Sequence, residues 1–206
     1  KLEPPFIPGM EVAGEILEIG QGVNRPLNVG QRVMAFMRGG GAFAEEVLVD
    51  SEWLVPVPDE MDDVIAAGFP TVYGTSYFAL KHRGNLQAGE TLLVLGAAGG
   101  VGLTAVELGK TMGANVIAAA GGSEKCIVAI DHGADFAIDY KSEDLNSALK
   151  KLCPDGVNIV FDNVGGEFLS ESLLHIAEKA RIVLCGAISS VGKAQSSISV
   201  SNYMSL

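Results

Sequence analysis

The stretch 91–103 decides the fold of this chain, and it reads Thr-Leu-Leu-Val-Leu-Gly-Ala-Ala-Gly-Gly-Val-Gly-Leu. An apolar run, 92–95, leads into a turn of very small residues, and apolar side chains then recur at helical spacing from Val101 to Met112. The order is strand, glycine turn, helix. A helix that begins at such a turn offers unpaired backbone N–H groups and a partial positive charge to an anion. The stretch therefore predicts a site for a dinucleotide pyrophosphate.

The glycine turn departs from the standard fingerprint G-x-G-x-x-G at its first position. Ala97, Gly99 and Gly102 occupy the three fingerprint positions. We expect the ligand to approach Gly99 most closely, so that a side chain there would block the pyrophosphate and strain the backbone. A glycine-rich turn that binds no ligand is the alternative that this motif alone leaves open. The surrounding sequence favours the ligand.

Strands and helices alternate beyond this turn. We expect strands at 115–119, 134–138, 157–161 and 181–185, and helices at 124–132, 145–152 and 168–179. The first of these helices is expected to turn Ile127 and Ile130 inward and to end at Gly133. Apolar strands that alternate with helices form a parallel sheet covered on both faces. The fold class is therefore α/β, with a doubly wound parallel sheet of the Rossmann type that binds ligands at the carboxyl ends of its strands.

The first seventy residues show a different pattern. Short apolar alternations separated by glycine turns predict a β-rich unit, with segments at 11–19, 31–36 and 43–49. Two helices are expected next, at 61–67 and 72–81, separated by Gly68 and Pro70. We place the junction near 70–75 and divide the chain into domains 1–72 and 73–206. A cleft between two unlike domains is a common ligand site.

The turn after the second strand of the series indicates which dinucleotide binds. An NAD site usually places Asp or Glu about 20 residues beyond the glycine turn, on the ribose 2′-hydroxyl. Here the strand runs out into Ala119-Ala120-Gly121-Gly122-Ser123-Glu124-Lys125, with no carboxylate before Glu124. Ser123 can donate a hydrogen bond and Lys125 supplies a positive charge, which favours NADPH over NADH. The alternative is that Ser123 only caps a helix and Lys125 is a solvated residue.

Composition narrows the function classes. The net charge of −11 argues against a broad nucleic-acid surface, and no apolar run is long enough to span a bilayer. The three cysteines match no metal or redox spacing and are expected to be reduced thiols. They are Cys126, Cys153 and Cys185. A serine-rich stretch covers 189–205.

A series of motifs resembles one known family. In order, the motifs are Pro8-Gly9-Met10-Glu11-Val12-Ala13-Gly14, Gly30-Gln31-Arg32-Val33, Gly41-Ala42-Phe43-Ala44-Glu45, Tyr73-Gly74-Thr75-Ser76-Tyr77, Gly96 to Gly102, Gly133-Ala134-Asp135, Ile138-Asp139-Tyr140 and Asp162-Asn163-Val164-Gly165-Gly166. The chain resembles the medium-chain dehydrogenases/reductases along its whole length, and among them the zeta-crystallin-like quinone oxidoreductases. The resemblance implies part of a GroES-like β domain followed by a Rossmann domain that binds NADPH.

The resemblance also implies a set of cofactor-binding residues. They are Thr75, Ala98, Gly99, Gly100, Val101, Ser123, Lys125, Tyr140, Asn163 and Gly186. By this resemblance Thr75 lies near the pyrophosphate and nicotinamide, and residues 98–101 form the pyrophosphate turn. The segment 123–125 reads the 2′-phosphate and Tyr140 lies near the adenosine ribose. The two remaining residues face the ribose–nicotinamide half.

The chain departs from the zinc-dependent relatives, which carry His where this chain has Met10. They also carry a four-cysteine zinc loop, whereas no cysteine precedes Cys126 here. The three histidines show no ligand spacing, and we expect no metal site. Without a Lewis acid, alcohol oxidation is disfavoured. Hydride transfer to an electron-poor acceptor, such as a quinone or an α,β-unsaturated carbonyl, depends less on Lewis-acid catalysis.

We therefore expect a zinc-independent, NADPH-dependent reductase with a small-molecule acceptor. The alternatives are an NADPH-binding structural or inactive crystallin-like protein and an enoyl-thioester reductase. No residue is assigned as catalytic, and solvent is the expected proton source. By the family pattern Lys1 begins inside the β domain and Leu206 precedes the sixth strand of the Rossmann sheet. We expect the full-length protein to be a cytoplasmic homodimer; a targeting peptide ahead of Lys1, for mitochondria, is the open alternative.

Overall fold

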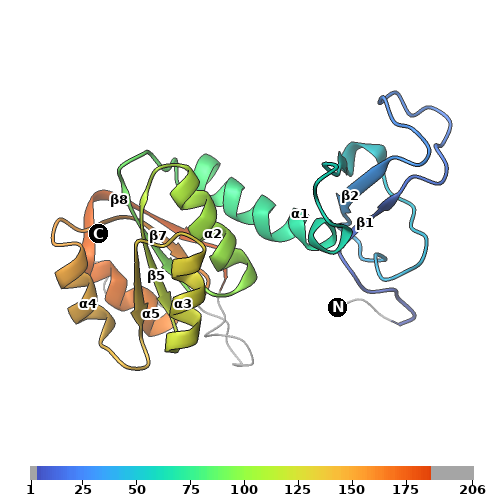
Figure 1. The fold of residues 1–206 in the computed structure, drawn as a ribbon. Coiled ribbons are helices and arrows are strands. Elements are labelled where there is room, and N and C mark those ends of the chain that lie inside the picture. Colours follow the sequence, from blue (N-terminus) through green and yellow to red (C-terminus); the bar gives the residue numbers. More distant parts are fainter. Residues whose placement is uncertain (1–3, 187–206) are drawn as a thin grey trace. The chain divides into compact units, whose positions relative to one another are not determined.

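The computed structural model describes residues 4–186, so the serine-rich stretch 189–205 lies outside the described residues. The chain divides into two compact units, Lys1–Gly74 and Thr75–Leu206. Figure 1 shows both units and labels most of their helices and strands.

The first unit contains a three-stranded antiparallel sheet of order β1-β2-β3. The strands are β1 (Glu11–Glu15), β2 (Arg32–Phe36) and β3 (Leu54–Pro56), preceded by a 3-10 turn, η1 (Ser51–Trp53). Met34, Val57 and Ala66 form its small core. The β-rich prediction is confirmed, but the expected strand at 43–49 is wrong. Phe43 and Leu48 are 74% and 96% exposed, so this apolar alternation has no buried face that would pin it to the sheet.

One helix, α1 (Asp63–Tyr77), replaces the two helices expected at 61–67 and 72–81, and it contains Pro70. A six-residue π-helix, η2 (Phe78–Arg83), follows it directly. Proline removes one backbone donor from a helix. The next donor along the chain, the Thr71 N–H, donates to a carboxylate oxygen of Glu11 on β1 at 2.9 Å. The helix continues through Pro70, and the N–H group of the residue after the proline is bound by the Glu11 side chain.

The second unit is built on five strands in the order β6-β5-β4-β7-β8, all paired in parallel. They are β4 (Thr91–Leu95), β5 (Asn115–Ala120), β6 (Phe136–Asp139), β7 (Val157–Asp162) and β8 (Ile176–Leu184). The order of the strands along the chain is thus third, second, first, fourth, fifth, which is that of a doubly wound Rossmann sheet. The predicted fold class is confirmed.

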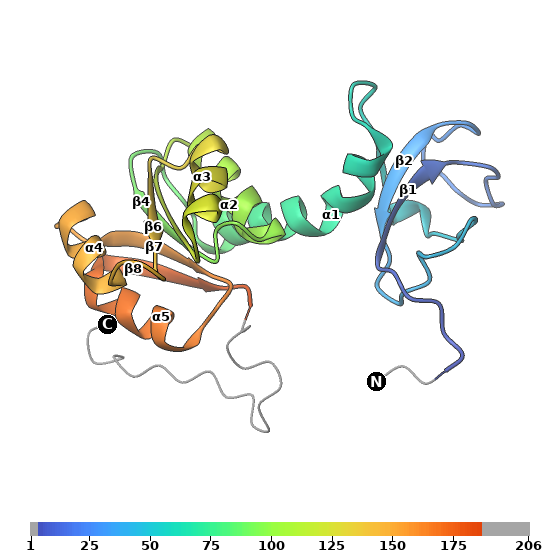
Figure 2. The ribbon, with the colours of Figure 1, turned by 60° about the horizontal axis from the view of Figure 1, so that its bottom comes forward.

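Helices cover both faces of this sheet, as Figure 2 shows. They are α2 (Gly100–Thr111), α3 (Ser123–Asp131), α4 (Leu145–Leu152) and α5 (Gly166–Ser172), with a 3-10 turn, η3 (Leu173–His175). Leu92 and Val94 of β4 pack into the core on the α2 and α3 face. Leu93 and Leu95 pack into the core on the α4 and α5 face. Residues 92–95 of β4 are apolar, as suits a strand that is buried on both faces.

Two expectations for the helices of this unit are wrong. The helix predicted at 168–179 ends early, because Ile176 pairs with Val157 in the sheet and begins β8. Helix α3 turns Ile127 and Ile130 outward, where they are 59% and 42% exposed. The residue that α3 buries is Ala129, since a small side chain lets the helix approach the sheet closely. Gly133 follows α3 with a φ of 105°, as expected of a C-terminal cap.

Within residues 4–186, none of the helices combines the length and hydrophobicity that a membrane span requires.

Candidate functional site

The carboxyl ends of five parallel strands meet at one edge of the sheet, and the predicted cofactor residues follow these strand ends. The turn after β4 contains 96–99, the turn after β5 contains 121–122, and Tyr140 follows β6. Asn163 follows β7, and Gly186 lies just beyond β8. Because open α/β sheets bind ligands at this edge, it is the candidate site.

Glycines shape the turn after β4 in different ways. Gly96 has a φ of 71°, so the left-handed conformation falls on it and not on Ala97, which occupies the first fingerprint position. A Cβ on Gly102 would lie 2.2 Å from the carbonyl oxygen of Gly96, so this glycine permits close packing of helix on strand. Gly99 has a φ of −83° and room for a Cβ, with the nearest atom at 3.6 Å. The expected backbone strain at Gly99 is therefore wrong.

The N-terminus of α2 is open toward this turn. Gly99 is its N-cap residue and offers no side-chain cap, and the first turn carries no acidic residue. The first N–H groups of a helix have no partner within the helix. An anion bound next to Gly99 would meet these donors and the positive end of the helix dipole.

Two buried hydroxyls that the sequence did not single out fix the first turn of α2. Ser76, at the end of α1, is fully buried, and its Oγ donates to the Val101 carbonyl oxygen at 2.7 Å. It also lies 2.8 Å from the Oγ1 of Thr104, which bonds the Gly100 carbonyl oxygen at 3.2 Å. Thr75, which precedes Ser76 along the chain, is half-buried. The only signal in the sequence was a serine next to a threonine near the end of a largely apolar helix.

The turn after β5 packs against Tyr140. A Cβ on Gly121 would lie 2.8 Å from the Cε2 atom of the Tyr140 ring. That ring also contacts Phe168 of α5, with centroids 4.4 Å apart and the planes tilted by 42°. Ser123 and Lys125 follow on the first turn of α3, both exposed. Burial raises the pKa of Tyr140, so its hydroxyl stays protonated and can donate a hydrogen bond.

Asp139, at the end of β6, brings a carboxylate to this turn. Its Oδ1 accepts from the Gly122 N–H at 2.7 Å and from the Lys141 N–H at 3.0 Å. The Lys141 N–H lowers the pKa of Asp139 most and, against an opposing effect of desolvation, the Gly122 N–H lowers it further. A carboxylate therefore reaches this turn from a neighbouring strand, although none precedes Glu124 along the chain. The contact follows from the register of the folded sheet, in which Asp139 pairs with Ala120, and the sequence alone carried no signal for it.

The turns after β7 and β8 lie against the first turn. A Cβ on Gly96 would lie 3.0 Å from Val164 and 3.6 Å from Asn163. A Cβ on Gly186 would lie 2.8 Å from the carbonyl oxygen of Asn163. The structure thus brings Asn163 and Gly186 together, with Asn163 beside Gly96.

A buried carboxylate holds the turn after β7. Asp162 is fully buried, and its Oδ1 accepts from the N–H groups of Val164 and Gly165, both at 2.8 Å. Its Oδ2 is buried and has no hydrogen-bond partner among the described residues. Burial, and next the charge of Asp162, raises the pKa of Cys185 to about 11. The Cys185 thiol is therefore protonated at neutral pH.

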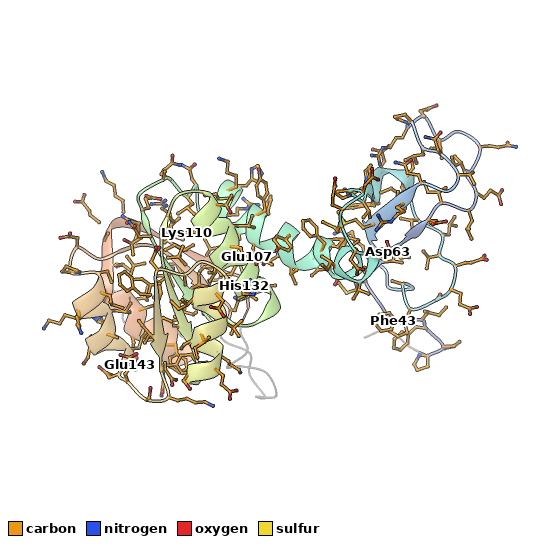
Figure 3. All side chains as sticks on the ribbon, in the orientation of Figure 1. Phe43, Asp63, Glu107, Lys110, His132 and Glu143 are labelled. Atoms are coloured by element: carbon orange, nitrogen blue, oxygen red, sulfur yellow. The ribbon has the colours of Figure 1, made fainter. Side chains whose placement is uncertain are left out.

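The histidines are engaged elsewhere. His132 Nδ1 lies 2.5 Å from a carboxylate oxygen of Glu107, and Figure 3 shows both side chains close to Lys110. His175 Nε2 contacts the Asn146 amide oxygen. Across residues 4–186, no three or more His, Cys, Asp or Glu side chains gather in a way that could hold a metal ion.

Comparison with protein families accounts for this architecture. The family model for the alcohol dehydrogenase GroES-like domain matches residues 1–59, and the model for zinc-binding dehydrogenases matches residues 100–205, about half of the chain. The chain belongs to the medium-chain dehydrogenase/reductase family. Its relatives place it in the quinone oxidoreductase-like branch. The first unit is therefore GroES-like and the second is the Rossmann unit.

Three known proteins illustrate the similarity. Quinone oxidoreductase-like protein 2 from Bos taurus is 41% identical over 184 residues, which are 88% of this chain and 52% of the bovine protein. The quinone oxidoreductase from Thermus thermophilus, solved also in complex with NADPH, is 36% identical with a TM-score of 0.75, covering 90% of this chain and 56% of that one. The CurK enoyl reductase is 29% identical with a TM-score of 0.80, covering 87% and 53%. The chain spans about half the length of the curated relatives it matches.

The family to which the chain belongs is one of oxidoreductases.

Proposed function

We propose that the full-length protein is an NADPH-dependent reductase that transfers a hydride to a quinone or an α,β-unsaturated carbonyl without zinc. The observation that carries this proposal is the open N-terminus of α2 behind Gly99, with the exposed Lys125 on the neighbouring turn. An uncapped helix N-terminus suits a pyrophosphate, and a lysine suits a further phosphate. The NADPH complex of the Thermus thermophilus relative supports the same cofactor.

The residues at the carboxyl edge fit such a dinucleotide. The backbone of 98–101 would hold the pyrophosphate, because Gly99 leaves free space before the first turn of the helix. Ser123 and Lys125 would hold the 2′-phosphate, and Tyr140 would flank the adenosine ribose. Thr75, Asn163 and Gly186 would face the nicotinamide half. When bound, NADPH supplies the hydride; the residues of this chain bind and orient it.

The proposal uses neither a metal nor a side-chain acid. Met10 takes the place of the histidine that zinc-dependent relatives carry, and a thioether is a poor zinc ligand beside oxygen and nitrogen donors. The adjacent Glu11 carboxylate accepts the Thr71 N–H at 2.9 Å and so serves the helix α1. We assign the final proton to solvent. We further propose the functional division 1–72 and 73–206, a cytoplasmic location and a homodimer for the full-length protein.

The test is steady-state oxidation of NADPH by the full-length protein and by this chain, with a panel of quinones and enones. We expect turnover by the full-length protein that survives a strong chelator, and no stoichiometric zinc by metal analysis. Chelator inactivation that added zinc reverses would contradict zinc independence. Binding of NADPH without turnover of any acceptor would favour a structural or inactive crystallin-like role instead.

An enoyl-thioester reductase is the second candidate, and it is favoured by the similarity to the CurK enoyl reductase. The same assay decides between the two when enoyl thioesters are added to the panel. A kcat/KM for an enoyl thioester that exceeds those for all quinones by about tenfold or more would replace the leading proposal.

A further inference from the structure

Strand β6 carries a carboxylate beside each of its ends, and both carboxylates reach the backbone of β5 or its following turn. At the amino end, Asp135 Oδ2 accepts from the Val116 N–H at 2.8 Å, and its Oδ1 pairs with Lys110. At the carboxyl end, Asp139 Oδ1 accepts from the Gly122 N–H at 2.7 Å. Lys110 and Glu143, labelled in Figure 3, mark these two ends. The two bonds are alike, but only that of Asp139 lies at the candidate cofactor site.

Gly122 has an unusual conformation that this bond holds. Its φ of 114° lies in a region that residues with side chains rarely adopt. It is also the N-cap residue of α3 and offers no side-chain cap. Ser123 and Lys125 lie in the first turn of the helix that follows Gly122. The backbone conformation of Gly122 therefore sets the positions of both side chains.

The same oxygen atom fixes the neighbouring turn. Asp139 Oδ1 also accepts from the Lys141 N–H at 3.0 Å, which closes a short turn around Tyr140. The Tyr140 N–H in turn donates to the Ala120 carbonyl oxygen at 3.2 Å. The Tyr140 ring packs against Gly121 so closely that a Cβ on Gly121 would lie 2.8 Å from the Cε2 atom of the ring. One acceptor therefore joins the turn that carries Lys125 to the turn that carries Tyr140.

We propose that Asp139 is a positioning residue for cofactor selectivity, because its Oδ1 fixes the spacing between Lys125 and Tyr140, on either side of a 2′-phosphorylated adenosine ribose. The inference rests on the proposed function, since it takes NADPH as the ligand. The oxygen acts as an acceptor of two N–H groups. Its negative charge opposes a phosphate, so a neutral acceptor in the same place serves at least as well.

The experiment is a titration of the full chain with NADPH and with NADH, followed by fluorescence. The variants are Asp139→Ala, Asp139→Asn and, as a matched control, Asp135→Ala. For Asp139→Ala we expect NADPH affinity to fall about tenfold or more and NADH affinity to fall less than about threefold. Asp139→Asn keeps the acceptor and should bind NADPH as tightly as the wild type or more tightly. Asp135→Ala loses a similar strand-to-strand bond and should leave both affinities unchanged.

Several outcomes would overturn the proposal. These are wild-type NADPH affinity in Asp139→Ala, equal losses for NADPH and NADH, or an equal loss in Asp135→Ala, which would indicate general loosening of β6. A wild-type chain that binds neither dinucleotide contradicts the proposed function and this inference together, whereas a wild-type preference for NADPH with an unaffected alanine variant contradicts this inference alone.

A second variant decides the matter if Asp139→Ala does not fold. Asp139→Glu keeps the charge but moves the acceptor by one methylene, and we expect about tenfold weaker NADPH binding. Wild-type affinity in that variant would overturn the proposal. Hydrogen exchange at the Gly122 amide gives an independent readout: slow in the wild type and in Asp139→Asn, and fast in Asp139→Glu.

Discussion

The turns after β4 and β5 lie next to each other at the edge of the sheet, yet they hold their shapes by different means. The first turn is packed backbone against backbone, with Gly102 directly behind the carbonyl of Gly96. The second turn is held by side chains from the next strand, through Asp139 and the ring of Tyr140. Its own polar side chains, Ser123 and Lys125, are exposed.

From this difference we expect the first turn to determine the affinity for dinucleotides in general and the second turn to determine the selectivity for NADPH over NADH. A turn made of backbone donors presents the same N–H groups to any dinucleotide, because every dinucleotide has the same pyrophosphate. A turn positioned by side chains can be altered one group at a time. We therefore expect changes in the first turn to affect NADPH and NADH alike, and changes in the second to affect NADPH alone.

Substitution of Gly99→Val is expected to have the largest effect on binding. The protein leaves room for a Cβ at Gly99, so the domain should fold, but the side chain would stand where the pyrophosphate approaches. Loss of two or more charge-assisted hydrogen bonds corresponds to about a hundredfold loss of affinity or more. Titration of the folded variant with both dinucleotides is the measurement. If Gly99→Val binds NADPH as the wild type does, the pyrophosphate does not bind at this turn.

Substitution of Gly102→Ala tests the packing behind the same turn. Its Cβ would lie 2.2 Å from a backbone oxygen, so either α2 or the turn must move, and overpacking of this kind costs about 1–3 kcal/mol. Urea unfolding should show the loss, with Gly99→Ala as the matched control of wild-type stability. Equal stability of the two alanine variants would mean that the first turn is not rigidly packed.

Substitution of Lys125→Ala tests the second turn. Loss of one charge-assisted bond to the 2′-phosphate should weaken NADPH binding about tenfold and leave NADH binding nearly unchanged. Lys110→Ala is the control, because Lys110 pairs with Asp135 at the opposite end of the sheet. Equal losses for NADPH and NADH would show that Lys125 does not distinguish the two cofactors.

The smallest expected effect is a slow rate of alkylation of the Cys185 thiol, at the carboxyl edge of the sheet. With a pKa of about 11, Cys185 is almost wholly protonated at pH 8, whereas an ordinary thiol has a pKa of about 8.5. Iodoacetamide should therefore label Cys185 slowly at pH 8, with a rate that rises roughly tenfold per pH unit up to pH 10. Mass spectrometry after timed labelling measures the rate. Fast labelling at pH 8 would indicate that the turn beyond β8 is open in solution.

The sequence predicted those elements whose local signals agree with their packing. Helix α4 has the predicted bounds 145–152, because Asp144 caps it, its Oδ1 accepting the Ser147 N–H at 2.8 Å, and Pro154 follows its end. The order of the strands followed from the alternation of apolar runs and helices. Both are readable along the chain without knowledge of neighbours.

The errors arose where the same apolar spacing was compatible with two structures. Leu169, Leu173 and Ile176 fit one helical face, and the first two are buried in the structure, but Ile176 already belongs to β8. Ile127 and Ile130 fit an inward helical face although the helix packs through Ala129. Periodicity identifies a face and cannot say on which side of a helix the sheet lies.

The site was predictable for residues that stand in a motif and not for those supplied by a neighbouring strand or helix. The glycine turn and its neighbours at the strand ends could be named from the sequence. Asp139 and Ser76 could not, because their roles depend on which backbone groups the fold brings within reach. Nothing in the spacing of Asp139 and Gly122 along the chain indicates their contact.

The outward isoleucines of α3 have a consequence for handling the protein. Ile127 and Ile130 face solvent on a chain whose net charge is −11 at pH 7 and whose isoelectric point is near 4.6. At neutral pH, mutual repulsion keeps such molecules apart. Repulsion vanishes near the isoelectric point while the apolar side chains remain exposed, and at neutral pH salt weakens it by screening. Colloidal stability is therefore lowest near the isoelectric point of about 4.6, and purification is best kept above pH 7 at low ionic strength.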